Sequence, residues 1–145
     1  MIREIRQDDK ETFMEMAKKF YSSPAVSHNV GEEIIVRTFE AAVNKSPYIR
    51  AFILEDSGTA VGFGLISFTF ATEVGGLAVL LEDLYLDESC RGKGLGSKFM
   101  QFIENEFPSA ERFRLEVAKE NTRAIDLYEK LGYKTLDYVQ MIKEK

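Results

Sequence analysis

The chain of 145 residues is poor in the residues that build covalent or metal-based frameworks. It has one cysteine, one histidine and no tryptophan. A single cysteine, Cys90, excludes an internal disulfide framework and favours a reducing compartment, so we expect a cytoplasmic protein. Because Cys90 and His28 stand far apart in the sequence, we expect no structural zinc site and no other metal.

Long apolar runs and linker-like segments are also missing. No stretch approaches the ~20 apolar residues of a membrane span, and the first ten residues, MIREIRQDDK, are charged, unlike a secretory signal. With three prolines and neither a repeat nor a Pro/Gly/Ser-rich linker, the sequence predicts one domain over residues 1–145. We therefore expect no membrane partner.

The charge balance is acidic, with a formal net charge of -5 and a pI of about 5.0. A general nucleic-acid binder is normally basic, so no nucleic-acid partner is expected. An acidic balance is compatible with small cationic substrates, although bulk charge says little about one site.

Apolar periodicity predicts a mixed α/β protein. Apolar residues have helical spacing in four segments. The first begins after Asp8 or Asp9 and reaches Phe20, the second covers about 32–44, the third follows a glycine run and stops before Pro108, and the fourth covers 121–131. Strand-like segments are 2–6, 48–55, 60–72, 77–87, 112–118 and 133–143, the last as one strand or two. The resulting order is β-α-α-β-β-β-α-β-α-β, a mixed sheet with helices on both faces.

The stretch SCRGKGLGSKF, residues 89–99, concentrates glycine and positive charge between a strand and a helix. Gly92, Gly94 and Gly96 alternate behind Arg91, with Lys93 among them. Successive amides at a helix N-terminus can cradle an anion, and a pyrophosphate suits that geometry. The Walker A and dinucleotide-binding patterns fit this spacing badly. A flexible connector is the plain alternative.

Two segments carry a resemblance to a known family. LEDLYLDESCRGKGLGSKFM resembles motif A of the GCN5-related N-acetyltransferase (GNAT) superfamily, whose signature is Arg/Gln-x-x-Gly-x-Gly/Ala. NTRAIDLYEKLGYK is similar to the Asn-x-x-Ala-x-x-x-Tyr-x-x-x-Gly-Phe/Tyr segment of the same family. The matching residues are Arg91, Gly94, Gly96, Asn121, Ala124, Tyr128, Gly132 and Tyr133. The sequence of residues 81–85 and 91–97 is similar to that of the spermidine/spermine acetyltransferase-like branch of the family.

This resemblance implies the GNAT fold, a mixed and mostly antiparallel sheet, with acetyl-coenzyme A as acyl donor. It implies that the pyrophosphate binds at Arg91, Gly92, Lys93, Gly94, Leu95, Gly96 and Ser97, and that Asn121 holds the pantetheine arm. It also implies a bulge at Leu84, Tyr85 and Leu86, where the main chain pairs with pantetheine and donates to an oxyanion. Of the three alternating glycines, we expect Gly92 to tolerate alanine best.

An acceptor amine must lose a proton before it attacks a thioester, and a carboxylate or an ordered water must take it. Glu82 and Asp83 lie within an apolar strand, where burial would raise a carboxylate pKa. Strand alternation predicts that they face opposite sides of the sheet. The resemblance favours Glu82 as base. Structural pairing of both carboxylates is the alternative, and Glu73 and Glu116 are weaker candidates.

Tyr128 occupies the position that the resemblance assigns to the acid that protonates the leaving thiolate. Its alternative role is core packing on an apolar helix face. Tyr21, His28 and Asp83 are expected near the acceptor, whereas Cys90 is expected only to pack.

These inferences predict acetyl transfer to a primary amine by direct attack in a ternary complex. We expect a small cationic amine as acceptor. The alternatives are a protein N-terminus or lysine, and a coenzyme A-binding sensor without turnover. Dimers are common in the family, so a homodimer is an assembly to test.

Overall fold

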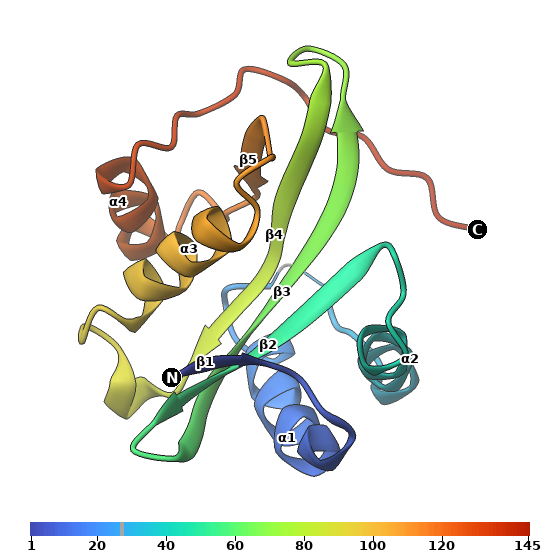
Figure 1. Ribbon diagram of the computed structural model, residues 1–145, viewed down its shortest axis with the longest axis vertical. Helices are drawn as coiled ribbons and strands as arrows, with labels where there is room; N and C mark the ends of the chain where they lie inside the picture. Colours follow the sequence, from blue (N-terminus) through green and yellow to red (C-terminus); the bar gives the residue numbers. More distant parts are fainter. Residues whose placement is uncertain (27) are drawn as a thin grey trace.

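The computed structural model describes residues 1–26 and 28–145. Five strands form one sheet in chain order (Figure 1). The first three pairings are antiparallel and the last, between β4 and β5, is parallel. The sequence prediction of a mixed, mostly antiparallel sheet is therefore confirmed. The strands are β1 (Ile2–Glu4), β2 (Ile49–Asp56), β3 (Thr59–Ala71), β4 (Gly76–Leu86) and β5 (Arg112–Leu115).

Helices cover both faces of this sheet, as Figure 1 shows. Helices α1 (Lys10–Tyr21) and α2 (Glu32–Val43) pack on one face through Phe13, Phe39 and Phe63. Helix α3 (Leu95–Glu106) packs on the other through Phe99 and Phe52, with α4 (Thr122–Lys130) beside it. The sheet therefore separates two apolar clusters, and strand β4 contributes side chains to both, as expected of a strand with apolar residues at both odd and even positions.

The β2–β3 hairpin closes with two residues, and its turn chemistry follows from the sequence. Asp56 pairs with Thr59, and the two turn residues have positive φ, 52° at Ser57 and 79° at Gly58. Two consecutive positive φ values define the tight turn whose twist matches the flanking strands. The sequence Asp-Ser-Gly between two strand-like segments predicts a hairpin turn, and the structure confirms it.

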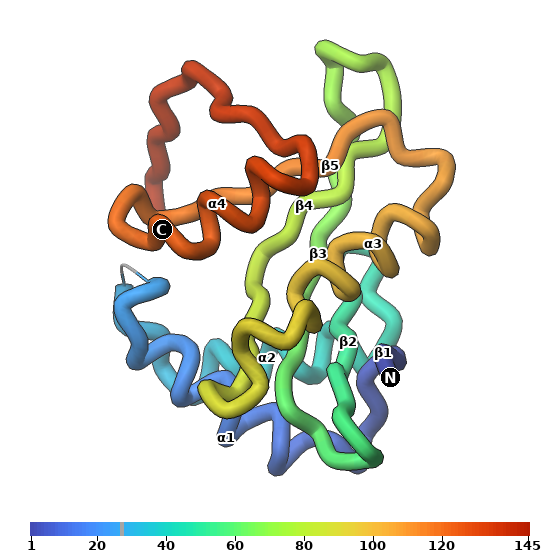
Figure 2. The backbone as a smooth tube through the Cα atoms, turned by 90° about the vertical axis from the view of Figure 1, so that its left-hand side faces the viewer, coloured from blue at the N-terminus to red at the C-terminus, as the bar shows by residue number. Residues whose placement is uncertain are grey.

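The predicted strand over 133–143 is wrong. After α4 the chain has no strand, and it curves away from β5 instead of running along it (Figure 2). In this segment the hydroxyl of Tyr138 donates to Glu73 at the tip of the β3–β4 hairpin. A strand exists only where a neighbouring strand accepts its backbone hydrogen bonds, and the alternation of polar and apolar residues cannot provide that partner.

Candidate active site

An irregularity in β4 sets the geometry of the acidic residues. Leu65 of β3 pairs with Asp83, and the next residue, Ile66, pairs with Leu81. Glu82 is therefore an extra residue in β4, which is the definition of a β-bulge. We expected the bulge at residues 84–86, and the structure places it at Glu82, because the β3–β4 register resumes regular pairing from Asp83 onward.

The bulge puts both carboxylates on one face of the sheet. Leu81 and Leu84 both pack toward α3, although they are three residues apart, so strand alternation breaks between them. Glu82 accepts a hydrogen bond from Ser67, which lies in β3 two residues after the α1-facing Leu65. The expectation that Glu82 and Asp83 face opposite sides is wrong, since the extra residue resets the alternation.

Asp83 is tied to the end of α1. The hydroxyl of Tyr21, the last residue of that helix, donates to Asp83 Oδ2. Burial raises the pKa of Asp83 to about 6; the hydrogen bond from Tyr21 opposes this rise and the neighbouring charge of Glu82 adds to it. Burial, then the charge of Asp83, raises the pKa of Tyr21, so this phenol stays protonated and keeps donating.

Strands β4 and β5 part immediately before these carboxylates. Their parallel pairing ends at Leu81 and Leu115, while β4 continues to Leu86. Where parallel strands separate, their main-chain N–H and C=O groups no longer bond to one another. An extended ligand can then pair with these groups as an added strand. The predicted pantetheine contacts lie on this continuation of β4.

The three residues predicted for those contacts use their side chains elsewhere. Leu84 and Leu86 pack toward α3, and Tyr85 is buried against α1. The Tyr85 hydroxyl donates to Asp87 at 2.9 Å, and burial raises its pKa to about 12. The Leu86 carbonyl accepts from Arg91 Nε at 2.9 Å. A ligand could therefore meet these residues only through their remaining main-chain groups.

The glycine run forms the turn that starts α3. Gly92 and Gly94 have φ values of 78° and 80°, and Gly94 is the N-cap of the helix. Leu95 is the first helical residue and Ser97 belongs to the first turn, while Lys93 is exposed. Left-handed glycines just before a helix N-terminus can expose backbone amides there, and exposed amides favour anions.

The geometry reverses the expected ranking of the glycines. Gly92 needs a positive φ that an alanine adopts only with strain, and a Cβ there would lie 3.1 Å from Arg123. Gly96 has no such φ, and a Cβ there would meet a methyl of Leu127 at 3.3 Å and a methyl of Leu84 at 3.9 Å. From this geometry we expect alanine to be tolerated best at Gly96, whereas the sequence favours Gly92.

Helix α4 supplies the two remaining predicted residues. The Asn121 side chain accepts from the Ala124 amide at 3.3 Å, so it caps the helix. Tyr128 is partly buried against the α3-side cluster, and its ring lies 5.9 Å from that of Tyr133. Burial raises the pKa of Tyr128 above its usual value, so its phenol is protonated at neutral pH.

Other sequence candidates lie outside this arrangement. His28 is exposed in the segment between α1 and α2, and within the described residues it forms no hydrogen bond or ion pair. Glu73 binds Arg112 at 3.2 Å and accepts from Tyr138, so it ties the C-terminal segment. Glu116 is exposed after β5, and Cys90 is buried just before the glycine run.

The structure thus forms two groups of candidates on opposite faces of the sheet. Tyr21, Glu82 and Asp83 gather on the α1 side, and the glycine run with Tyr128 lies on the α3 side. Sequence reasoning missed Ser67, since its meeting with Glu82 depends on the bulge. It also missed Arg123, because the place of this side chain beside Gly92 depends on how α4 packs against the glycine run.

The sequence matches a known protein family over most of its length. Residues 4–133 match the family model described as "Acetyltransferase (GNAT) family". The chain belongs to this family. The predicted family and the predicted class, an acyl-coenzyme A-dependent N-acetyltransferase, are therefore confirmed.

Two curated relatives are similar over nearly the full chain. A thialysine N-epsilon-acetyltransferase of Mus musculus is 29% identical over 93% of this chain and 84% of that protein. A thialysine N-epsilon-acetyltransferase of Sus scrofa is 27% identical over 94% of this chain and 85% of that protein.

Solved structures share the fold at low identity. A possible acetyltransferase from Clostridium difficile 630 has a TM-score of 0.85 at 20% identity, covering 100% of this chain and 97% of that one. AAC(6')-Iy in complex with the bisubstrate analog CoA-S-monomethyl-acetylneamine has a TM-score of 0.81 at 17% identity, with coverage of 100% and 97%. These likenesses confirm the predicted fold class.

Within residues 1–26 and 28–145, no group of three or more His, Cys, Asp and Glu side chains is arranged to hold a metal ion. No helix in the same residues is long and apolar enough to cross a membrane.

Proposed function

We propose that this protein transfers the acetyl group of acetyl-coenzyme A to a small primary amine by direct attack in a ternary complex. One observation carries the proposal. Strands β4 and β5 part at Leu81, with two carboxylates on one face of the adjoining bulge and a glycine turn at the start of α3 on the other. A donor lying between the strands would have a proton acceptor on one side and phosphate ligands on the other.

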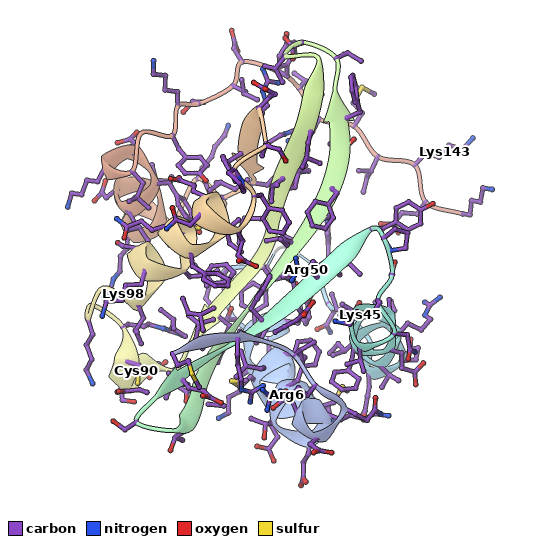
Figure 3. All side chains as sticks on the ribbon, viewed as in Figure 1. Arg6, Lys45, Arg50, Cys90, Lys98 and Lys143 are labelled. Carbon is purple, nitrogen blue, oxygen red and sulfur yellow. The ribbon has the colours of Figure 1, made fainter. Side chains whose placement is uncertain are left out.

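The residues present fit the donor. The turn at Gly92 and Gly94 supplies amides and the N-terminus of a 12-residue helix, with Lys93 exposed beside them. Figure 3 shows Lys98 of the first turn of α3 on the left-hand side of the view, above Cys90. Arg91 braces this turn against Leu86 through its Nε. The donor supplies an activated thioester, and the chain supplies its position.

The side chains near the separation of β4 and β5 are the proposed groups for proton transfer. An ammonium must lose a proton to become a nucleophile, and Glu82, directly or through a water, is the proposed acceptor of that proton. The new bond joins the amine nitrogen to the acetyl carbon, and the bond from that carbon to sulfur breaks. Tyr128, held neutral by burial, is the proposed donor of a proton to the departing thiolate.

Three findings support a small amine as acceptor. The two similar curated proteins are named for acetylation of thialysine, an amino acid with a side-chain amine. The fold neighbour AAC(6')-Iy was crystallised with an acetylneamine bisubstrate analog. In this chain, Glu82 and Asp83 together offer an acidic surface that attracts a cation.

The test is release of free thiol from acetyl-coenzyme A with a panel of acceptors. The panel should contain thialysine, lysine, polyamines, an aminoglycoside and peptides with a free N-terminus or lysine. Turnover with small amines and not with peptides supports the proposal. Turnover only with peptides favours a protein acetyltransferase, and tight coenzyme A binding without turnover favours a sensor.

Assembly and location remain predictions. We propose one domain, a cytoplasmic protein and a homodimer, the last because the C-terminal segment exposes large apolar side chains. Val139 and Met141 are each 90% exposed and Ile142 is 77% exposed. Figure 3 shows Lys143 at the end of this segment, pointing away from the rest of the chain. A second copy covering these side chains would remove them from water.

A further inference from the structure

Helix α4 lies against the glycine run through two contacts with the same spacing. A Cβ on Gly96 would lie 3.3 Å from Cδ2 of Leu127, and a Cβ on Gly92 would lie 3.1 Å from Nη2 of Arg123. Residues four apart share one helix face, so α4 presents both side chains to the run at once. The contact of Leu127 packs α4 against Gly96, and the other contact places the guanidinium of Arg123 beside Gly92.

This guanidinium is not held there by a carboxylate. The ion pairs formed within the described residues do not include Arg123, even though Asp126 follows it on the same helix. Arg123 is exposed, and residues 91–98 add three cations and no acid beside it. Of these cations Arg91 lies 4.0 Å from Glu88, whereas Lys93, Lys98 and Arg123 have no ion pair within the described residues. Cations without a counter-charge repel one another, and an anionic ligand would relieve that repulsion.

We propose that Arg123 is a donor-binding residue whose guanidinium holds a phosphate group of acetyl-coenzyme A against the glycine run. The inference rests on the proposed function, since it adds a ligand to the same donor site. A guanidinium offers a planar fork of donors that matches phosphate oxygens. The missing Cβ at Gly92 lets that fork approach the turn whose amides face the same anion, which gives Gly92 a reason beyond its positive φ.

The first experiment measures binding without any amine acceptor, so it does not depend on turnover. Dissociation constants for coenzyme A and for dephospho-coenzyme A are compared in the wild type, Arg123→Gln and Arg123→Lys. Lys130→Gln is the matched control, because Lys130 is another exposed cation at the far end of the same helix. Thermal melts check that each variant is folded.

We expect Arg123→Gln to weaken coenzyme A binding by roughly tenfold or more, as loss of a charge-assisted hydrogen bond does. We expect Arg123→Lys to recover part of the loss and Lys130→Gln to change little. An equal loss with both ligands assigns the contact to the pyrophosphate, and a loss only with coenzyme A assigns it to the 3′-phosphate. Unchanged constants for both ligands, or a loss no larger than that of Lys130→Gln, would overturn the inference.

A double-mutant cycle tests the role of Gly92. Gly92 and Gly94 have nearly equal φ values, 78° and 80°, but only Gly92 has a neighbour within 4 Å of its Cβ position. The effect of Gly92→Ala on binding should therefore shrink in the Arg123→Gln background, whereas that of Gly94→Ala should not. If the effects of Gly92→Ala and Gly94→Ala on binding were both additive with that of Arg123→Gln, the contact between Arg123 and Gly92 would play no part in binding. A wild type that binds neither ligand defeats the proposed function itself, which separates the two failures.

Discussion

Glu82 and Asp83, adjacent in the sequence, project from the same face of the sheet. Their arrangement differs from ordinary strand geometry because Glu82 is the extra residue of a bulge. The two side chains nevertheless have different surroundings: Glu82 is exposed and bonded to Ser67, while Asp83 is more buried and bonded to Tyr21. Neighbouring carboxylates in unlike environments can hold different roles.

The first prediction concerns stability against pH. Because burial raises the pKa of folded Asp83 to about 6, the folded chain holds a proton between about pH 4 and 6 that the unfolded chain releases. Stability contributed by this group falls as pH rises through that window, by about 2–3 kcal/mol for a shift of about two pKa units. Asp83→Asn should therefore be more stable than the wild type at pH 8 and not at pH 4. Denaturant unfolding at both values measures this, and an equal difference at the two pH values would contradict it.

The second prediction concerns the base. Glu82→Gln should lower kcat at neutral pH by roughly 10²-fold or more, the range of general base catalysis, and leave coenzyme A affinity unchanged. Asp83→Asn is the matched variant, since it removes the neighbouring charge and keeps a hydrogen-bond acceptor for Tyr21. Steady-state kinetics over pH 5–9 distinguish them. If only Asp83→Asn lost turnover, the base would be Asp83.

The third prediction concerns the acid. Tyr128→Phe removes one hydroxyl and keeps the ring packed beside Tyr133. Turnover should fall by roughly 10²-fold, and the affinity for coenzyme A should stay nearly the same. Tyr133→Phe is the control on the neighbouring ring. Unchanged turnover in Tyr128→Phe would leave Tyr128 as a packing residue only.

The fourth prediction concerns the contact between the sheet and α3. A Cβ on Gly64 of β3 would overlap the ring of Phe99, which is fully buried. Gly64→Ala should therefore destabilise the fold by about 1–3 kcal/mol, the usual cost of overpacking. Gly31→Ala is the comparison, because its Cβ would meet only the flexible end of Glu33. Thermal melts that give equal losses for the two variants would show that the ring of Phe99 gives way.

The fifth prediction concerns assembly. The full chain should elute as a dimer in size-exclusion chromatography with light scattering, and a chain that ends at Lys134 should elute as a monomer. The truncation removes the exposed Val139, Met141 and Ile142 and leaves the five-stranded sheet intact. Equal masses per particle for both chains would show that this segment is not the contact.

Much of the fold could be read from local patterns. The Ser57–Gly58 turn, the cap at Asn121 and the helix end at Gly132, where φ is 93°, each depend on neighbours in the chain. The contribution of β4 to both apolar clusters followed from its apolar residues at both odd and even positions. The strand after Gly132 could not be predicted in this way, because strand formation needs a partner and the chain there turns toward Glu73 instead.

The sequence by itself determined the family, the order of the elements up to α4 and the glycine turn, because motif spacing and periodicity are properties of the chain alone. Only the tertiary structure decided which way the chemical groups face. The bulge at Glu82 arises from the register between β3 and β4, and the position of Arg123 over Gly92 arises from the packing of α4 on α3. Both depend on contacts between segments far apart in the sequence, which no local pattern encodes.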